Sequence, residues 1–564
     1  MKTVIVGGVA GGATAAARIR RLDEHAEILV FERSGFISYA NCGLPYYIGG
    51  IIEDKRSLTL QTPESFYKRF RVNMKVHHEV TAIHPENKTV TVKDLESGEV
   101  FDESYDKLLL SPGAKPIVPP LGNISKGNVF VLRTVEDTLA IREYAEKNKP
   151  RSAVIAGGGF IGIEVAENLR ELGMDVSIIQ SGSQLLAPLD YDMASFIHSE
   201  MRNKGVNLLF NRRVEGIEEV DGKTVVKLKG CGAVSADLVI LAIGVSPETT
   251  LAKDAGLALG IKGSIVVNDR METSIPDIYA VGDAVQIKNF VTDTDAVISL
   301  AGPANKQGRI AADNICGRDS RYTGGQGSSV IKIFDMTAAS TGINEKTAQA
   351  LGICADKVIL SPMSHAGYYP GGQSMTMKVL FEKGTYRLLG AQIVGFDGVD
   401  KRIDVLATAI RAKMKAYELA ELDLAYAPPY SSAKDPVNMA GYIIENIKNG
   451  VVKQWYYEDI ECLQRDENIT LLDTRTPREY SSGHVDGFVN IPVDELRERI
   501  GELDRNKPVY VICQSGLRSY IATRILAGNG FDCYNFAGGF RFYDTVHNDK
   551  ESSKRSTPCG MDNF

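Results

Sequence analysis

One local pattern occurs twice in this chain and constrains its fold more than any other feature. It consists of an apolar strand, a glycine-rich turn, a helix and a second strand. The first copy comprises Thr3-Val4-Ile5-Val6, a turn over residues 7–12, a helix to about Leu22 and a strand from Glu27 to Phe31. The second copy comprises a strand at 152–156, a turn at 157–162, a helix at 163–172 and a strand at 175–179. Glycine lets the backbone approach a pyrophosphate, and a helix N-terminus offers it free N–H groups and a favourable dipole. Either copy alone is a weak signal, but two copies in full context predict an α/β chain with two Rossmann-like dinucleotide-binding units.

The two units end differently. Glu32 follows the second strand of the first unit, where a carboxylate would accept the ribose hydroxyls of a nucleotide. Gln180 stands at the corresponding place in the second unit. Val9 replaces the usual middle glycine of the first turn, so that copy is imperfect. We expect the chain to bind two dinucleotides.

Composition narrows the classes of function. The 564 residues are 44% hydrophobic and 24% charged, and 64 Lys+Arg against 71 Asp+Glu give a net charge of −7. This balance argues against a general binder of nucleic acids or membrane surfaces. No apolar run approaches the roughly 20 residues that span a bilayer. The eight cysteines include no close pair of the kind that binds zinc, so we expect no metal site. Scattered cysteines in a large chain fit a reducing cytoplasm, which is the expected location.

A third stretch adds a resemblance to a known family. Ser274–Asp283 is an apolar strand that delivers an acid beside a glycine, and alone it would be a strand with an acid-capped turn. Together with the two glycine turns it resembles the pyridine nucleotide–disulfide oxidoreductases. The resemblance implies FAD at the first turn and NAD(P)H at the second. It assigns Gly7, Val9, Gly12, Glu32, Arg33 and Asp283 to FAD, and Gly157, Gly159, Gly162 and Gln180 to the nicotinamide nucleotide. Gln180 is not an acid, yet no arginine follows it to hold a 2′-phosphate, so we expect NADH, with NADPH as the alternative.

Cys42 lies in the segment from Ser38 to Tyr46, shortly after Glu32. Most disulfide reductases carry a pair of cysteines here, and this chain has no second cysteine nearby. A lone thiolate beside a flavin must take its redox partner from outside the chain, as a mixed disulfide, a persulfide or a sulfenic acid. We expect its place at the start of a helix, beside a flavin, to lower its pKa. A buried, inert core cysteine is the alternative, which its placement after the FAD motif disfavours.

The segment around Cys42 is similar to the active site of coenzyme A (CoA) disulfide reductases, and the similarity continues to about Ile447. It includes the motifs His365–Gly371 and Ala425–Ser431. The resemblance implies a homodimer in which Tyr368 and Tyr426 reach the cysteine of the partner subunit. A phenol there can donate a proton to the departing CoA thiolate. Without the resemblance, both aromatic side chains would be assigned to packing in a dimer interface.

The same resemblance implies a binding site for CoA. It assigns Thr14, Arg18, Arg21, Ser38, Asn41, Asn305 and Lys434 to CoA. Arg18 and Arg21 are three residues apart and share one helix face, which suits phosphate groups, although such arginines are also common on a solvated surface helix. Residues 68–71 could extend the site, but Phe70 falls where a basic group would be expected.

The C-terminal region contains a second cysteine in a chemical setting. A strand at 508–512 ends at Cys513-Gln514-Ser515-Gly516-Leu517-Arg518-Ser519, and a helix follows. A loop from Cys513 to Arg518 can wrap N–H groups around one sulfur and stabilise a thiolate or persulfide. The region resembles the single-domain rhodaneses, which carry sulfane sulfur on a cysteine. Protein phosphatases have a similar loop between cysteine and arginine that is one residue longer, because phosphate is larger; four intervening residues favour sulfur. A unit that merely docks another protein is a third alternative, but it would have no reason to keep both residues.

These observations predict the organisation and the activity. The expected segments are an FAD-binding domain at 1–115 and 246–323, an NAD(P)H-binding domain at 116–245, an α+β dimerisation domain at 324–447, a linker at 448–454, an α/β rhodanese domain at 455–547 and a loose polar tail at 548–564. The predicted activity is NADH-dependent reduction of CoA disulfide, CoA persulfide or polysulfide through Cys42, with release of hydrosulfide. Cys513 would deliver sulfane sulfur to CoA, which is expected to be either a diffusible substrate or a tightly bound cofactor. The alternatives are an NADH oxidase or peroxidase that cycles a sulfenic acid, and a protein that is mainly a sulfur carrier.

Overall fold

The computed structural model describes residues 1–122, 127–220, 223–230 and 232–555. Contacts between residues divide the chain into two compact units. Among the described residues, the first unit contains 1–182 and 205–327, and the second contains 183–204 and 328–555. In the described residues, no helix combines the length and the apolar character that a membrane crossing needs.

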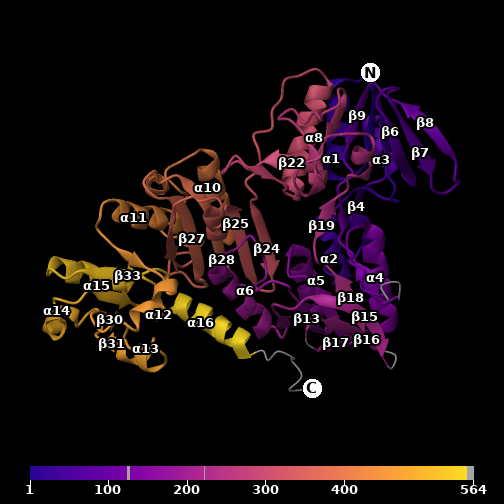
Figure 1. Cartoon of the computed structure of the whole chain (residues 1–564). Helices are drawn as coiled ribbons and strands as arrows, with labels where there is room; N and C mark the ends of the chain where they lie inside the picture. Colours follow the sequence, from indigo (N-terminus) through magenta and orange to yellow (C-terminus); the bar gives the residue numbers. More distant parts are fainter. Residues whose placement is uncertain (123–126, 221–222, 231, 556–564) are drawn as a thin grey trace. The chain divides into compact units, whose positions relative to one another are not determined.

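The first unit contains two five-stranded parallel sheets (Figure 1). The first sheet has the order β21-β9-β1-β2-β5, formed by Ile278–Ala280, Lys107–Leu110, Lys2–Val6, Glu27–Phe31 and Asn73–Lys75. The second has the order β11-β18-β12-β13-β14, formed by Val129–Val131, Leu238–Leu241, Ser152–Ala156, Asp175–Ile179 and Asn207–Leu209. The helices of this unit are α1 (Ala10–Leu22), α2 (Leu44–Ile48), α3 (Pro63–Phe70), α4 (Val135–Asn148), α5 (Phe160–Glu171), α7 (Thr250–Asp254) and α8 (Ala301–Ile315). Both predicted Rossmann-like sheets are therefore confirmed.

Smaller antiparallel sheets accompany the two parallel ones. One joins β6 (His78–His84), β7 (Thr89–Asp94) and β8 (Val100–Ser104), and another joins β15 (Val214–Val220), β16 (Lys223–Leu228) and β17 (Ala233–Ala236). Shorter pairings involve β3 (Ile37–Tyr39) with β4 (Thr59–Gln61), β10 (Ala114–Pro116) with β19 (Val245–Pro247), and β22 (Val285–Lys288) with β20 (Ile265–Val266) and β23 (Asp295–Ala296). Buried aliphatic residues such as Ile5, Val30 and Leu109 fill the space between the first parallel sheet and helices α1 and α8. Burial of both faces explains why these strands read as continuous apolar runs.

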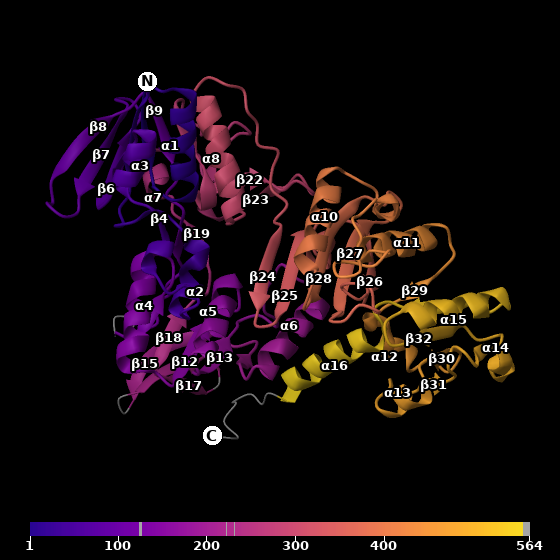
Figure 2. The same cartoon turned by 180° about the vertical axis from the view of Figure 1, so that it is seen from behind.

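The second unit begins with a five-stranded antiparallel sheet of order β24-β25-β28-β27-β26. Its strands are Ser329–Ile333, Met336–Gly342, Leu388–Gly395, Met375–Glu382 and Ala355–Leu360, and its helices are α9 (Glu345–Ala350), α10 (Val399–Arg411) and α11 (Pro436–Lys448). Figure 2 shows α10 along one face of this sheet. Helix α6 (Tyr191–Asn203) also belongs to the second unit by its contacts, although the sequence places it inside the expected NAD(P)H-binding domain.

The rest of the second unit is a five-stranded parallel sheet with flanking helices. The sheet has the order β29-β33-β32-β30-β31, formed by Gln454–Trp455, Cys533–Phe536, Val509–Ile512, Thr470–Asp473 and Val489–Asn490. The helices are α12 (Ile460–Leu463), α13 (Pro477–Ser481), α14 (Leu496–Arg499), α15 (Leu517–Gly528) and α16 (Gly539–Arg555). Part of the predicted linker joins this sheet, because the Asn535 N–H donates to the Lys453 carbonyl at 2.8 Å and Gln454 pairs with Asn535.

The expected loose tail is wrong for residues 548–555, which continue helix α16. Asp549 is 2% exposed and accepts a hydrogen bond from the Tyr191 hydroxyl at 2.7 Å. Its carboxylate also lies 2.8 Å from Nδ1 of His198 and 2.5 Å from Arg202. The sequence of the tail is polar and therefore does not reveal that Asp549 is buried, because the partners of this carboxylate lie on α6. Residues 556–564 of the predicted tail lie outside the described residues.

A second buried ion cluster lies between α6 and the antiparallel sheet. Nζ of Lys378 is 2.8 Å from Asp192 and 3.0 Å from Asp190, and it also contacts Glu345. Burial alone lowers the pKa of Lys378, but the charges of the three carboxylates raise it above its ordinary value. These carboxylates lie close enough together to resemble a metal site. Because the ammonium of Lys378 lies among them and neutralises their charge, the cluster is better explained as a structural ion network.

Candidate functional site

The first glycine turn forms where β1 meets α1. Gly7 has a φ of +99°, and a Cβ there would lie 2.1 Å from the Ser111 carbonyl oxygen. A Cβ on Gly12 would lie 1.9 Å from the Gly7 carbonyl oxygen. The turn therefore requires glycine at both positions. Glu32, at the end of β2, accepts a hydrogen bond from the Gly8 N–H at 2.8 Å, so its carboxylate lies directly against this turn.

The second turn, between β12 and α5, has the same construction. Gly157 has a φ of +114°, and a Cβ on Gly162 would lie 2.0 Å from the Gly157 carbonyl oxygen. Gln180 accepts from the Gly158 N–H at 3.0 Å, in the role that Glu32 has in the first turn. No atom lies within 4 Å of a Cβ built on Gly159, which is the N-cap of α5. Open space before free helix N–H groups fits a pyrophosphate at this turn.

Asp283 lies in a single turn just after β21, as the sequence predicts. Its carboxylate accepts from Nη2 of Arg133 at 3.1 Å. Burial raises the pKa of Asp283, and Arg133 partly offsets this rise. With the Asn41 amide oriented to satisfy both groups, Asn41 accepts from Arg133 Nη1 at 2.7 Å and donates to the Arg133 carbonyl at 3.1 Å. Arg133 thus connects Asp283, which is a predicted FAD residue, with Asn41, which directly precedes Cys42. Sequence reasoning missed it, because a lone arginine before a helix carries no motif signal.

Cys42 lies in the turn Asn41–Gly43, immediately before α2, and is exposed in the chain. All six cysteines that the structure describes are free, so Cys42 forms no disulfide with any of the other five. The expectation of a lowered pKa is wrong for the polypeptide itself. Burial of the thiol raises its pKa, and the charge of Glu164 adds to the rise, while Arg133 acts in the opposite direction. The short turn and α2, which has five residues, supply too little aligned dipole to reverse this.

Glu164 is the second residue near Cys42 that sequence reasoning missed. It lies on α5, and burial together with the charge of Glu167 raises the pKa of Glu164 to about 7. Tyr46, four residues after Cys42, is hydrogen-bonded to Glu164. The charge of this carboxyl group acts on the Cys42 thiol, and only the tertiary structure reveals that the two groups are neighbours.

Six of the seven residues expected at CoA lie in the first unit. Thr14 Oγ1 donates to Oδ1 of Asn305 at 2.5 Å, which brings α1 and α8 together at these two predicted positions. Arg18 is committed to Asp313, with Nε 2.8 Å from Oδ1, whereas Arg21 is exposed. Ser38 adopts a φ of +43°, an uncommon conformation for serine. Lys434 is exposed and belongs to the second unit, and Arg33, expected at FAD, is also exposed.

The two predicted tyrosines come together although 58 residues separate them in the chain. The hydroxyl oxygens of Tyr368 and Tyr426 are 2.6 Å apart, and the residues are 75% and 45% exposed. The hydrogen bond with Tyr368 raises the pKa of Tyr426. Two exposed phenols held in this way form a polar pair that can share or donate a proton.

The loop after β32 surrounds the sulfur of Cys513. The Gly516 N–H donates to Sγ at 3.1 Å, and the Ser519 hydroxyl lies 3.2 Å from the same sulfur. Gly516 has a φ of +100°, which turns the loop into α15. Cys513 itself is 0% exposed. A sulfur anion in this loop would therefore receive donors from both the backbone and a side chain.

Arg518 extends from the same loop to helix α13. Its guanidinium binds Glu479 through two hydrogen bonds of 2.6 and 2.8 Å. This pairing lowers the pKa of Glu479 to about 2, against the opposing effect of burial. Sequence reasoning anticipated Arg518 but not Glu479 or Ser519, because only the folded loop shows which groups face the cysteine.

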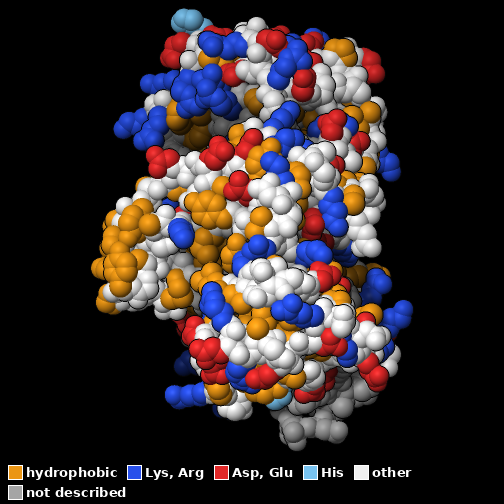
Figure 3. All heavy atoms as spheres, turned by 90° about the vertical axis from the view of Figure 1, so that its left-hand side faces the viewer, with side chains coloured by type: hydrophobic (Ala, Val, Ile, Leu, Met, Phe, Trp, Pro, Cys, Tyr) orange, Lys and Arg blue, Asp and Glu red, His pale blue; other side chains and the backbone are white. Residues whose placement is uncertain are grey.

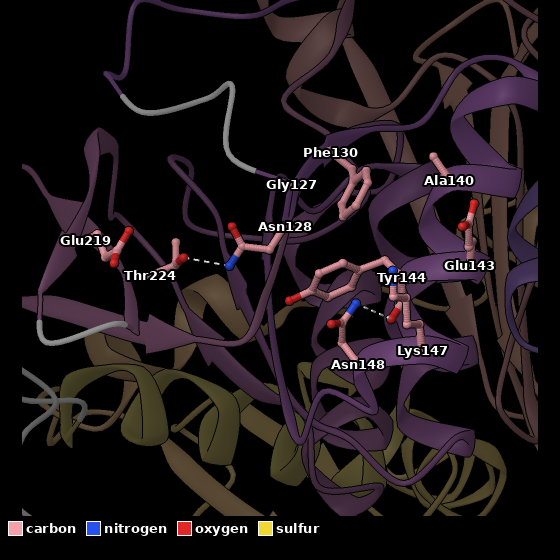
Figure 4. Close-up of a pocket in the computed structure, with 10 residues that line it drawn as sticks. All are labelled: Gly127, Asn128, Phe130, Ala140, Glu143, Tyr144, Lys147, Asn148, Glu219 and Thr224. Carbon is pink, nitrogen blue, oxygen red and sulfur yellow. Dashed lines mark hydrogen bonds between the residues drawn. The ribbon is translucent and has the colours of Figure 1, made fainter.

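One further hollow lies away from all predicted residues. It has a volume of about 560 Å³ and is lined by residues of α4, β11, β15 and β16 (Figure 4). Asn128 donates to Thr224 at 2.6 Å across it, and Tyr144 lies against Phe130 with ring centroids 5.5 Å apart. None of the sequence-predicted site residues lines this hollow.

Comparison with known proteins supports this assignment of domains. Residues 1–308 match the family described as pyridine nucleotide-disulphide oxidoreductase, residues 328–436 its dimerisation domain, and residues 454–544 the rhodanese-like domain. A coenzyme A disulfide reductase of Staphylococcus epidermidis is 39% identical over 442 residues, which cover 78% of this chain and 99% of that protein.

Solved structures of similar proteins extend over nearly the whole chain. Bacillus anthracis CoADR-RHD in its reduced form is similar with a TM-score of 0.95 and 48% identity, over 97% of this chain and 98% of that chain. A NAD-dependent persulfide reductase from A. fulgidus gives a TM-score of 0.90 at 38% identity, covering 96% of this chain and 100% of its own. A water-forming NADH oxidase from Lactobacillus brevis gives 0.77 at 30% identity and covers 80% of this chain and 100% of its own. The chain therefore belongs to the pyridine nucleotide–disulfide oxidoreductase family and carries an additional rhodanese domain at its C-terminal end.

Proposed function

We propose that the protein is an FAD-dependent, NADH-preferring reductase of CoA disulfide and CoA persulfide that works as a homodimer. The observation that carries the proposal is that Cys42 is free and follows, in the sequence, the first of two glycine turns that each fit a dinucleotide. The relatives named as a CoA disulfide reductase and a persulfide reductase support this choice of substrate. The match to a dimerisation domain supports the homodimer. A reducing cytoplasm is the expected location, since the six described cysteines are free.

Residues at the two turns would hold the cofactors. Gly7, Gly12, Glu32 and Asp283 would hold FAD, and Gly157, Gly159, Gly162 and Gln180 would hold the nicotinamide nucleotide. FAD, when bound, supplies the transfer of two electrons from NADH to sulfur. The amide of Gln180 carries no charge to repel a 2′-phosphate, so the proposed preference for NADH rests on the lack of an arginine among the residues directly after it, 181–184.

The thiolate of Cys42 would attack CoA disulfide, forming a Cys42–CoA mixed disulfide and releasing one CoA thiolate. With CoA persulfide, attack on the CoA-bound sulfur gives the same mixed disulfide and releases hydrosulfide. Two electrons then cleave the mixed disulfide into the Cys42 thiolate and a CoA thiolate, which is the second CoA released from CoA disulfide and the only one from CoA persulfide. Tyr368 and Tyr426 would supply protons to departing thiolates, which the short hydrogen bond between their hydroxyls supports.

The rhodanese domain would provide the persulfide. Cys513 accepts sulfane sulfur from a donor, the Cys513 loop stabilises the persulfide anion, and the thiolate of CoA takes the outer sulfur to become CoA persulfide. The donors from Gly516 and Ser519 to Sγ support this role.

Anaerobic NADH consumption tests the proposal. We expect turnover with CoA disulfide and CoA persulfide, little with peroxide, and loss of turnover in Cys42→Ser, while Cys513→Ser keeps reductase activity and loses sulfur transfer from thiosulfate. Mass spectrometry of the intact protein should show a CoA adduct on Cys42 after incubation with CoA disulfide. Turnover with peroxide or oxygen alone would instead indicate an oxidase or peroxidase. Persistence of all NADH-dependent turnover in Cys42→Ser would show that Cys42 does not carry the reduction and would reject the proposal, and loss of function only in Cys513→Ser would then favour a sulfur carrier.

A further inference from the structure

The groups around the Cys513 loop decide which molecule can deliver sulfane sulfur to it. Cys513 is 0% exposed, so the reacting atom of a donor has to leave water to reach the Cys513 sulfur. Moving a charged group out of water is costly unless an opposite charge compensates it. Thiosulfate carries two negative charges, whereas an organic persulfide, R–S–SH, carries at most one at its sulfur atoms. The charge available at the loop therefore distinguishes these two kinds of donor.

Two arginines lie at this loop, and both are already paired with carboxylates. Arg475 lies 3.4 Å from the side chain of Gln514, and its Nη2 donates to Asp473 at 2.7 Å. The side chains of this pair are almost completely buried. Arg518, which belongs to the loop itself, donates two hydrogen bonds to Glu479. Neither guanidinium is therefore free to compensate the charge of a dianion.

The pair of Arg518 and Glu479 lies where a donor would approach. Their side chains are 30% and 32% exposed, so both reach the surface. The hydrogen bond with Glu479 raises the pKa of Arg518, and the charge of Cys513 contributes to this rise. Arg518 is thus within electrostatic reach of the reactive sulfur. An anionic donor would meet the carboxylate of Glu479 together with this guanidinium, and the two charges cancel.

A third arginine, Arg541, does not supply the missing positive charge. Its backbone N–H donates to the Gln514 carbonyl at 3.3 Å, which places its backbone beside the loop. Its guanidinium, however, donates to the Ser374 hydroxyl. Burial alone lowers the pKa of Arg541, so the charge of Cys513 does not act on it as it does on Arg518.

The exposed surface of the loop is apolar where the loop continues into α15. Leu517, the first residue of α15, is 59% exposed, and Ile521 is 41% exposed. Residues four apart share one face of a helix, so these two side chains form an apolar strip that starts at the loop. Figure 3 views the side of the molecule on which α15 lies in Figure 1. In its lower half, hydrophobic side chains lie among both basic and acidic ones, without a concentration of positive charge.

We propose that the sulfur donor of Cys513 is a small organic persulfide whose carbon group contacts Leu517 and Ile521, and that thiosulfate is only a poor substitute for it. Glu479 is the positioning residue that sets this preference, because it occupies and neutralises Arg518. The inference rests on the sulfur-delivering role that the proposed function gives to the rhodanese domain, and it adds the chemical class of the donor.

The transfer step balances without a further reactant. The thiolate of Cys513 attacks the outer sulfur of R–S–SH, the S–S bond of the donor breaks, and R–S⁻ leaves. The proton stays on the outer sulfur of the new Cys513 persulfide. One S–S bond forms as another breaks, so no oxidant or reductant is needed.

The discriminating experiment compares benzyl persulfide with thiosulfate as donors to the full-length holoprotein without NADH. The persulfide on Cys513 is trapped with iodoacetamide and quantified over time by peptide mass spectrometry. We expect the rate constant with benzyl persulfide to exceed that with thiosulfate by at least about tenfold. Glu479→Gln frees the charge of Arg518 and should raise the thiosulfate rate constant about fivefold, a gain that shrinks as salt rises. The amide keeps an oxygen that can accept from the Thr476 N–H, as the Glu479 carboxylate does at 2.9 Å.

The apolar strip is tested by a second variant with the opposite preference. Leu517→Gln should lower the rate constant with benzyl persulfide about fivefold and have a much smaller effect on thiosulfate. Glu498→Gln, at an exposed position on α14, is the matched control for loss of one carboxylate and should change neither rate constant.

The outcomes separate this inference from the proposed function. Equal rate constants for the two donors would overturn the inference, and so would a thiosulfate rate constant that Glu479→Gln leaves unchanged or an equal fall with both donors in Leu517→Gln. The readout needs neither NADH nor CoA, so failure of the reductase function would show separately, as no turnover with CoA disulfide. If neither donor forms a persulfide on Cys513, the sulfur-delivering role in the proposed function fails, and this inference fails with it.

Discussion

At the scale of single residues, the two reactive cysteines differ in how the protein treats their sulfur. Cys42 is exposed as a residue, but neighbouring protein atoms partly desolvate its thiol, and this desolvation and the charge of Glu164 raise its pKa. Cys513 is buried, and two donors from its own loop face its sulfur. The turn at Cys42 therefore leaves its residue exposed to a partner molecule, whereas the loop at Cys513 directs two donors at its sulfur. This contrast agrees with a cysteine that exchanges large disulfides and another that stores one atom.

The effect of the Glu164 charge on the Cys42 thiol leads to a prediction about the pH at which this thiol reacts. Glu164→Gln removes a nearby negative charge, so the pKa of the Cys42 thiol should fall, and alkylation of Cys42 by iodoacetamide should reach its plateau at lower pH. Arg133→Gln removes the opposing positive charge and should shift the profile to higher pH. Peptide mass spectrometry measures both profiles. Glu171→Gln, an exposed position on the same helix, is the control, and equal shifts in all three variants would contradict the electrostatic explanation.

The contact of the Ser519 hydroxyl with the sulfur of Cys513 leads to a prediction about the rate of sulfur transfer. Ser519→Ala removes one of the two donors to the sulfur, and a hydrogen bond to a charged group contributes about 1.5–3 kcal/mol. We expect the rate of sulfur transfer from thiosulfate to fall by at least about tenfold, with no change in NADH-dependent reduction of CoA disulfide. Ser515→Ala, in the same loop, serves as the comparison. A variant of Ser519 that transfers sulfur at the original rate would show that the backbone donors suffice.

At the scale of elements, each glycine turn combines close backbone approach with open space. In the second turn, a Cβ on Gly162 would meet the Gly157 carbonyl at 2.0 Å, whereas a Cβ on Gly159 would meet nothing within 4 Å. Gly162 therefore serves the contact of α5 with β12, and Gly159 leaves room in front of the helix N-terminus. The glycines of one motif therefore meet two different physical requirements, which are close helix–strand packing at Gly162 and space for a ligand at Gly159.

These two glycines give a prediction for helix α5. Gly162→Ala forces α5 away from β12 and should destabilise the first unit by about 1–3 kcal/mol. Gly159→Ala, at a φ of −83°, should keep the thermal stability and instead raise the KM for NADH. Thermal denaturation and NADH kinetics of the two variants check this separation. A loss of stability in Gly159→Ala would mean that the space before α5 is not reserved for a ligand.

At the scale of the whole molecule, helix α16 fixes the rhodanese domain within the second unit. Leu185 N–H donates to Nε2 of His198 at 3.0 Å, so Nδ1 carries the proton that faces Asp549. Burial lowers the pKa of His198, against the effect of Asp549. Hydrogen bonds with His198, Arg202 and Tyr191 outweigh burial and hold the pKa of Asp549 at about 2. The ring of Phe542 adds an apolar contact to Phe196, with centroids 6.1 Å apart. The rhodanese domain is thus bound to α6 by a defined contact as well as by its chain connection.

Substitution of Asp549 tests this contact. Asp549→Asn removes the negative charge that lies against His198 and Arg202 and should weaken the contact of α16 with α6 by about 1–3 kcal/mol. Hydrogen exchange should rise in α16 and α6 and stay unchanged in β12 and β13. Asp544→Asn, an exposed position on the same helix, is the control. Unchanged protection of α16 in Asp549→Asn would show that apolar contacts alone hold the helix.

The same groups predict how the contact responds to acid. The folded-state pKa of Asp549, about 2, lies below its ordinary value of 3.8, so its contribution is complete above roughly pH 4 and is lost as the pH falls toward 2. Protonation of the buried His198 opposes folding below its ordinary pKa, so destabilisation should begin in mildly acidic buffer. The protection of α16 amides, corrected for the pH dependence of the intrinsic exchange rate, should decrease as the pH falls, and less so in Asp549→Asn.

The sequence by itself determined the parallel sheets, both glycine turns, the lone cysteine near the flavin motif and the sulfur loop at Cys513. These features depend on residues close together in the chain, because backbone conformation and helix-terminus chemistry act over a few residues. The tertiary structure alone decided the position of Arg133 beside Asn41 and Asp283, the approach of Glu164 to Cys42, the pairing of Arg18 with Asp313 and the burial of Asp549 in a segment that reads as a polar tail. Electrostatic effects and burial depend on which distant residues meet, and no local pattern records those meetings.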